Sequence, residues 1–359
     1  MVHWKLTSLF VCLAYKGTSA TTTITTQTGD DTVFISSEAN QNTENARSVD
    51  VLLGWLDYIE QDLTVDVSIG RHRLLMSDEK SLIAKGEGES GPAVLTNRSL
   101  TNLRTNLGDI FFETDGNWSA GVNLWLGKGD DNLNVESVPS NAGSPPFRTV
   151  TSVHAGDGDD TLVISLETAD HDGVVFVANG QAGNDNIDAS MSSHPVILFG
   201  ERGNDILKGG QGSDVILGDL GNVIWREAVA TPEEQPERRL SATRFHSHAD
   251  LFQHHYSAKR SQGDIVARVG GGGYGDFSDG IIRTISEVRS LYVEVGGLDV
   301  IDTGDGENLA VGGFNNDIIQ GGSDNDILVR FCMDWASRSL KGILVCNLNL
   351  CRSLHPTGR

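Results

Sequence analysis

Nine acidic or amide side chains recur at one position of a glycine-rich nonapeptide, a pattern well suited to binding an ion. Four such units follow one another without a gap from residue 294 to 329: EVGGLDVID, TGDGENLAV, GGFNNDIIQ and GGSDNDILV. Five more lie between residues 126 and 217. The sixth position of the nine units is held by Asp131, Asp160, Asp185, Asp205, Asp214, Asp299, Asn308, Asp317 and Asp326.

The composition of the nonapeptide favours calcium over other ions. Glycines in the first half of the unit adopt turn conformations that let carbonyl oxygens converge. The aspartate adds a carboxylate, and the units contain no cysteine. Several hard oxygen ligands per site are the donor set that Ca²⁺ prefers. We therefore expect the nine sixth-position residues to be calcium ligands.

The same nonapeptide predicts the fold. Its first six residues form a turn, and its last three form a short strand whose middle side chain points into the core. A fixed short period with one inward apolar residue is typical of a stacked β solenoid. In the contiguous units this eighth position is Ile301, Ala310, Ile319 and Leu328. We therefore predict an all-β chain that winds as a parallel β-roll or β-helix.

The unit GGQGSDVIL at 209–217 fits each specified position of the consensus G-G-x-G-x-D-x-U-x. With its neighbours it resembles the repeats-in-toxin (RTX), or haemolysin-type, calcium-binding repeat family. The resemblance covers 126–226 and 294–329 well and 28–125 poorly. It implies a right-handed β-roll with two repeats per coil, and calcium between turns stacked one coil apart.

The resemblance also implies which residues pair. Asp299 is expected beside Asp317 along one edge of the roll, and Asn308 beside Asp326 along the other, since each pair is 18 residues apart. Asn308 supplies a neutral amide where the family pattern has a carboxylate, so its site is expected to be weaker.

Changes in composition divide the chain around the repeats. Short β-rich runs such as DLTVDVSI (62–69) predict degenerate coils in which side-chain packing replaces calcium. We expect, in order, a signal peptide at 1–20, a degenerate solenoid at 21–125, calcium-binding repeats at 126–225, a polar loop insertion at about 226–268, calcium-binding repeats at 269–329, and a C-terminal cap or disordered tail at 330–359.

Three further segments have competing interpretations. GDLGNVIW (218–225) keeps the repeat glycines but has Val223 where the aspartate belongs. GGGGYGDFSDG (270–280) contains the dinucleotide fingerprint G-x-G-x-x-G, but a β-like sequence follows it instead of a helix, which favours a degenerate turn. A transition-metal site is conceivable in the expected insertion, although a solvated loop explains its histidines better: His246, His248, His254 and His255.

Charge and processing signals limit partners and location. The formal net charge of −22 disfavours nucleic acid and anionic membranes as partners and favours cations. Residues 1–20 resemble a secretory signal, and no later stretch is long and apolar enough to span a bilayer. We therefore expect an extracellular or cell-surface location. Three cysteines follow the signal, so calcium rather than disulfides is expected to stabilise the fold.

The favoured function is calcium binding by a secreted or surface structural module whose folding is coupled to the ion. The chain contains neither H-E-x-x-H nor G-x-S-x-G, and we expect no enzyme activity. Two alternatives stay open. The chain could be a fragment of a larger RTX-type toxin, adhesin or hydrolase whose active region lies elsewhere. It could also be a degenerate solenoid that binds a protein or glycan partner, which the sequence does not identify.

Overall fold

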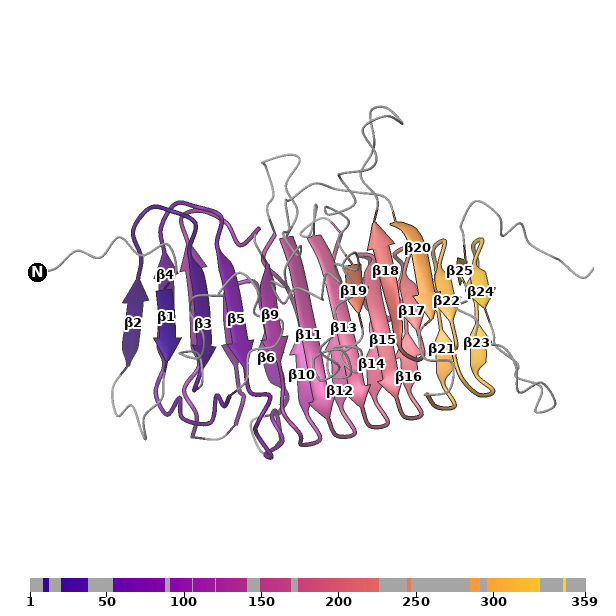
Figure 1. Cartoon of the computed structure of the whole chain (residues 1–359), viewed down its shortest axis with the longest axis horizontal. Helices are drawn as coiled ribbons and strands as arrows, with labels where there is room; N and C mark the ends of the chain where they lie inside the picture. Colours follow the sequence, from indigo (N-terminus) through magenta and orange to yellow (C-terminus); the bar gives the residue numbers. More distant parts are fainter. Residues whose placement is uncertain are drawn as a thin grey trace, which may run out of the picture.

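The computed structural model of the chain consists of strands stacked side by side along one long axis (Figure 1). Within the residues it describes, no helix is long and apolar enough to cross a membrane. The described residues are 9–12, 21–37, 54–87, 91–104, 106–119, 121–140, 149–168, 174–225, 244–246, 285–290, 296–329 and 345–346.

Two large sheets and one small sheet make up the fold. In spatial order, the first sheet contains β1 (Leu9–Cys12), β3 (Thr32–Ser36), β5 (Arg73–Ser77), β9 (Val122–Trp125), β11 (Thr149–Asp157), β13 (Val174–Ala182), β15 (Val196–Arg202), β17 (Val215–Leu217), β22 (Leu309–Val311) and β24 (Ile327–Val329). The second sheet contains β2 (Thr22–Thr25), β4 (Leu63–Val67), β8 (Ile110–Thr114), β7 (Ser99–Thr101), β6 (Ala93–Leu95), β10 (Asn132–Val135), β12 (Thr161–Ile164), β14 (Asn186–Asp188), β16 (Ile206–Lys208), β21 (Val300–Asp302) and β23 (Ile318–Gln320). The antiparallel sheet contains β19 (Arg244–His246), β18 (Gly221–Trp225), β20 (Ile285–Ser290) and β25 (Val345–Cys346).

The chain passes back and forth between the two large sheets, so that a coil contributes a strand to each. Parallel pairing places Ile301 beside Ile319 and Ala310 beside Leu328. These are eighth positions of units two repeats apart, so a coil there holds two repeats. An exception interrupts the second sheet, where β7 pairs antiparallel with both β6 and β8. The predicted all-β parallel solenoid is confirmed.

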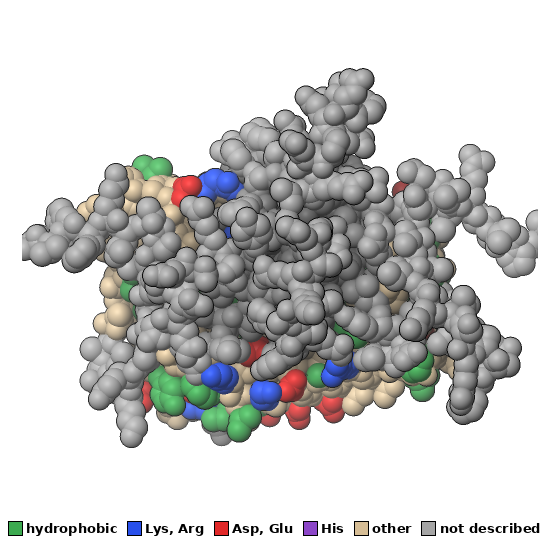
Figure 2. Space-filling view, viewed as in Figure 1, with side chains coloured by type: hydrophobic (Ala, Val, Ile, Leu, Met, Phe, Trp, Pro, Cys, Tyr) green, Lys and Arg blue, Asp and Glu red, His purple; other side chains and the backbone are tan. Residues whose placement is uncertain are grey.

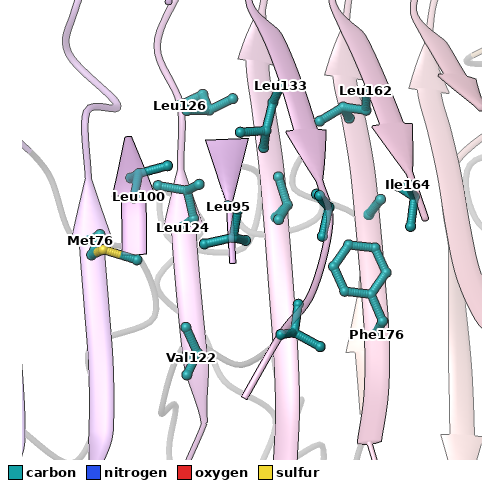
Figure 3. Packing of buried hydrophobic residues seen from close by; sticks show 14 of the residues in the cluster. Met76, Leu95, Leu100, Val122, Leu124, Leu126, Leu133, Leu162, Ile164 and Phe176 are labelled. Carbon is teal, nitrogen blue, oxygen red and sulfur yellow. The ribbon is translucent and has the colours of Figure 1, made fainter. Parts of the chain in front are cut away.

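Alternating apolar side chains fill the space between the two large sheets. In β16, Leu207 is fully buried while the adjacent Ile206 is 44% exposed. Leu207 lies beside Ile187 and Ile301 on the neighbouring strands. Figure 3 shows the same arrangement nearer the middle of the chain, where labelled side chains of both sheets occupy the interior. The strand period of two thus produces a core that runs the length of the solenoid.

A long insertion leaves the solenoid after Leu220 and returns at Gly296. Asp205 and Asp299 lie in successive coils although 94 residues separate them, whereas an uninterrupted two-repeat coil takes 18. The expected limits of the insertion, 226–268, are therefore too narrow. β20, expected within the repeats, instead pairs antiparallel with β18, and β19 shows that the insertion is not all loop.

The antiparallel sheet packs on the outer face of the first sheet. Val223 of β18 and Val288 of β20 belong to a second apolar cluster with Phe199, Leu217 and Val311. Phe199, Leu217 and Val311 each follow an inward-facing residue of β15, β17 or β22, so they lie on the outer face of the first sheet. Val223 is therefore a buried strand residue, because the chain has already left the solenoid at that point.

Other expectations concern residues at the margins of the described part. β1 comes from the predicted signal peptide at 1–20 and pairs with β3. His246 lies in β19, while the motif at 270–280 lies outside the described residues. So do the other histidines of the expected insertion and most of the tail, including His248, His254, His255, Cys332 and Cys351.

Replacing Leu207 by Ala should destabilise the solenoid by about 2–5 kcal/mol, because it leaves a cavity in the core. Ile206→Ala is the matched control on the solvent side of the same strand, with an expected change within about 0.5 kcal/mol. Urea unfolding in calcium-containing buffer measures both. Equal losses in the two variants would contradict the assigned strand register.

Candidate metal sites

The nine predicted ligand residues lie in turns along two edges of the solenoid. First-edge turns lead from the first sheet to the second and second-edge turns lead back. In Figure 2, acidic side chains (red) gather along the lower edge, where Figure 1 shows the first-edge turns. The first edge holds, in successive coils, Asp131, Asp160, Asp185, Asp205, Asp299 and Asp317. The second edge holds Asp214, Asn308 and Asp326.

The first-edge aspartates form a hydrogen-bonded ladder. The backbone N–H of each donates to Oδ1 of the aspartate one coil further on, at 2.6–3.2 Å. The ladder runs unbroken from Asp131 to Asp317, across sequence separations of 18 to 94 residues. Asp299 thus lies beside Asp317, the pair that the family resemblance implied. Each of these hydrogen bonds uses the Oδ1 atom of the carboxylate and so fixes its rotamer.

The second carboxylate oxygens form a row of buried acceptors. Oδ2 of Asp160, Asp185, Asp205 and Asp299 is buried without a hydrogen-bond donor, and each of these side chains is 1% exposed. At the start of the ladder, Asp131 Oδ2 instead accepts from the Gly127 N–H at 3.1 Å. Buried acceptors are costly unless they are paired. Four in consecutive coils therefore indicate a place for a proton or a cation.

The first glycine of the turn makes room for these oxygens. A Cβ atom built on Gly200 would overlap Asp205 Oδ2, and one built on Gly218 would overlap Asp299 Oδ2. Neither glycine has the positive φ that would by itself require glycine. The requirement at these positions is therefore space for the carboxylate oxygen and for the backbone carbonyl of the next coil, Gly218 beside Gly200 and Gly312 beside Gly218.

Asn308 on the second edge shows how the turn carbonyls converge. Its Nδ2 donates to the carbonyls of Gly304, Asp305 and Gly306 at 3.4, 3.1 and 2.9 Å, and to Asp326 Oδ1 at 3.0 Å. One nitrogen thus meets three carbonyls and a carboxylate. An aspartate there has no N–H to offer, so a cation would take the same oxygens. The amide explains physically why the Asn308 position is expected to bind an ion weakly.

Burial raises the pKa of the ladder carboxyls far above their ordinary range. The pKa is about 8 for Asp160, about 9 for Asp185, about 7 for Asp205 and about 8 for Asp299. Neighbouring carboxylates raise it further, as Asp205 and Asp160 do for Asp185. On the second edge, burial raises the pKa of Asp214 to about 7. At neutral pH the groups with a pKa of about 8 or 9 hold protons unless a cation replaces them.

Among the described residues, no three His, Cys, Asp or Glu side chains converge on a single point. A transition-metal site built from side chains is therefore not formed there. The oxygens that do come together are carboxylate Oδ2 atoms and turn carbonyls. Calcium accepts this mixture of side-chain and backbone oxygens, so the residues present fit calcium.

The first-edge turn between β17 and β21 is assembled from two segments. The Gly218 carbonyl accepts a hydrogen bond from the Glu201 N–H of the preceding turn at 2.8 Å, so Gly218 occupies the first position of this turn. Asp219 follows it, and its carboxylate accepts from the N–H groups of Gly297 and Phe314. Asp219 thus joins the two segments, which the insertion separates.

Asp219 was missed by the sequence analysis. The interpretation of 218–225 as one degenerate unit is wrong, because the turn continues at residue 296. The sequence did contain a signal, because two incomplete units complement each other. Gly218-Asp219 begins a unit that lacks the sixth-position aspartate, and residues 296–299 end a unit that lacks the opening glycine.

The fold and these turns define a parallel β solenoid with carboxylates stacked along an edge. Residues 197–224 and 295–328 match the family model of the RTX calcium-binding nonapeptide repeat, in four copies. The chain therefore carries RTX repeats, a structural module of the calcium-binding type, and the resemblance is confirmed. Asp131, Asp160 and Asp185 lie outside the matched residues but in the same ladder. No curated protein and no solved structure is detectably similar to the chain.

Without calcium, the solenoid should lose stability as pH rises. The pKa is about 8 to 9 for Asp160, Asp185 and Asp299 in the fold, against about 3.9 in an unfolded chain. Between these values the folded state binds more protons, so the unfolding free energy is greatest near pH 4 and falls toward pH 9. Urea unfolding in EDTA across this range measures it. A calcium-free midpoint that rises with pH would contradict the buried ladder.

Proposed function

We propose that the chain is an extracellular, calcium-binding structural module that gains its ordered fold as calcium binds. The observation that carries this proposal is the row of four buried, unpaired Oδ2 atoms on the first edge. Ionised carboxylates in such a row are unfavourable unless a cation neutralises them. The RTX repeats independently imply calcium.

The ions would be held between stacked first-edge turns. Asp160, Asp185, Asp205 and Asp299 would contribute their Oδ2 atoms, and the turn carbonyls would complete the shell. Asp131 and Asp317 extend this row at its two ends. The second-edge ligands would be Asp214 and Asp326, with Asn308 between them as a neutral substitute. Calcium is therefore expected mainly along the first edge.

Coupled folding follows from the charge of the ladder. At neutral pH the ion displaces protons from the buried carboxyls and neutralises the carboxylates that form, so binding favours the folded state in which these groups lie together. A site with a Kd of about 0.1 mM at about 1 mM calcium adds roughly 1.4 kcal/mol. Several such sites approach the whole stability of an ordinary domain.

The calcium affinity that is usual for modules of this kind suits an extracellular location. Extracellular calcium modules have dissociation constants of about 0.1 to 1 mM, which match calcium outside cells. The secretion-like residues 1–20 and the net charge of −22 agree with such a setting. In calcium-poor cytosol the repeats would stay loosely folded. We also propose that the module has no catalytic role of its own.

Asp205→Asn should remove one calcium equivalent and lower the thermal midpoint in calcium, because an amide cannot neutralise the ion. In EDTA at pH 8 the same variant should be as stable as the wild type or more so, because position 205 no longer has a buried group that can ionise. Asp66→Asn, on the exposed face of β4, is the control and should change neither quantity. Calorimetric titration and thermal unfolding measure them. A loss of stability in EDTA equal to that in calcium would contradict the ligand role.

Calcium titration of the full chain should show saturable binding of several ions, with a parallel gain of β signal in circular dichroism. Magnesium should not substitute, because it demands octahedral geometry and dehydrates reluctantly. Absence of binding well above about 1 mM calcium would overturn the proposal. It would leave a packing-stabilised solenoid with a protein or glycan partner as the better hypothesis.

A further inference from the structure

Lys85 occupies the place that an aspartate holds in the later first-edge turns. Its backbone N–H donates to Asp131 Oδ1 at 2.6 Å, and its carbonyl accepts from the Asn132 N–H at 2.9 Å. Asp131 makes the same two bonds to the next coil, through Asp160 Oδ1 and the Thr161 N–H. Lys85 is therefore the ladder residue of the coil before Asp131, and the row of aspartates ends on a lysine.

The Lys85 ammonium is surrounded by oxygens from two stacked loops. Nζ lies 2.5 Å from Asp78 Oδ2 and 3.2 Å from Asp57 Oδ1. It also donates to Ser81 Oγ at 2.9 Å and to the Ile83 carbonyl at 2.8 Å. Asp57 belongs to the loop after β3, and the other three belong to the loop after β5. Two carboxylates, a hydroxyl and a carbonyl around one buried positive charge resemble the donor set of a calcium ion.

The second edge of the early coils also avoids stacked carboxylates. The Asp31 N–H donates to His72 Nδ1 at 3.2 Å, where a later turn would offer a carboxylate oxygen. His72 Nε2 lies 2.7 Å from the Ser68 carbonyl. An imidazole nitrogen therefore takes the place of the ladder carboxylate oxygen, and it also lies 3.5 Å from Asp31 Oδ2.

We propose that Lys85 is an internal cation in place of calcium, so that the coils before Asp131 fold without the ion. These coils would then be folded before calcium binds, and the calcium-dependent coils would pair with their last strands. In a solenoid each coil contacts only its neighbours, so order propagates from a folded coil to the next. The inference rests on the proposed function, because it divides the chain into a calcium-independent base and a calcium-dependent extension.

Hydrogen–deuterium exchange of the full chain, in EDTA and in saturating calcium, tests the division. Amides of β4, β5, β8 and β9 should be protected in both conditions. Amides of β12, β14, β16, β21 and β23 should gain protection only with calcium. If the early strands exchange as fast as the repeats in EDTA and gain protection together with them, the inference is overturned while the calcium proposal stands. If no strand gains protection, the calcium proposal itself fails.

Lys85→Met tests the ammonium directly. In EDTA, the amides of β4, β5 and β9 should exchange roughly 100-fold faster, because the buried Asp78 loses its counter-charge. Lys208→Met is the matched control. It breaks a 2.6 Å pair with Asp188 in which the lysine is 42% exposed, and should leave these amides unchanged.

The double variant Lys85→Met/Asp78→Asn removes both charges of the shortest contact and keeps an Oδ1 acceptor for the buried Leu56 N–H. Asp57 keeps Arg104, whose Nη1 lies 3.3 Å from its Oδ1. No buried carboxylate then lacks a counter-charge at this contact, so the double variant should recover protection in EDTA even if the single variant does not fold. A double variant that exchanges as fast as Lys85→Met, or a single variant that exchanges like wild type, would overturn the role of Lys85.

Discussion

Stacked like charges are the constraint on which the rest of this solenoid depends. Adjacent strands lie about 4.8 Å apart, so ladder aspartates of successive coils meet at close range. Two ionised carboxylates at that separation repel by roughly 3 kcal/mol at an effective dielectric constant of about 20. The turn glycines, the buried Oδ2 atoms and the converging carbonyls are the features that would hold a neutralising positive charge between coils.

Much of the fold was predictable because the nonapeptide is a local signal. Each unit carries its own turn, its own strand and its own inward residue, so the pairing of Ile301 with Ile319 follows from counting. The ladder followed in the same way, since the sixth position of one unit must stack on that of a unit one coil away. Residue types at fixed spacing therefore predicted both the core residues and the candidate ligands.

What could not be predicted depends on contacts between segments far apart in the sequence. Asp219 completes a turn whose other half begins at Gly296, and a search for contiguous units divides that turn into two incomplete ones. Lys85 has no repeat around it, and its role depends on Asp57 and Asp78, which only the stacking of two irregular loops brings together. The repeat period therefore does not predict a residue of another type, such as this lysine, at the position of a ladder aspartate.

The insertion interrupts both edges, because 94 residues separate Asp205 from Asp299 on the first edge and Asp214 from Asn308 on the second, and only the first-edge pair consists of two carboxylates. A cation between Asp205 and Asp299 would join residues that are 94 apart in sequence, and so would close the loop formed by the whole insertion. Longer loops cost more entropy to close, so this contact contributes more to the order of the chain than contacts within an 18-residue coil. Asp219 accepts hydrogen bonds from Gly297, across the insertion, and from Phe314 in the next coil, and so holds the turn in register there. In the proposed coupling of calcium to folding, the largest contribution is therefore expected where the solenoid is interrupted.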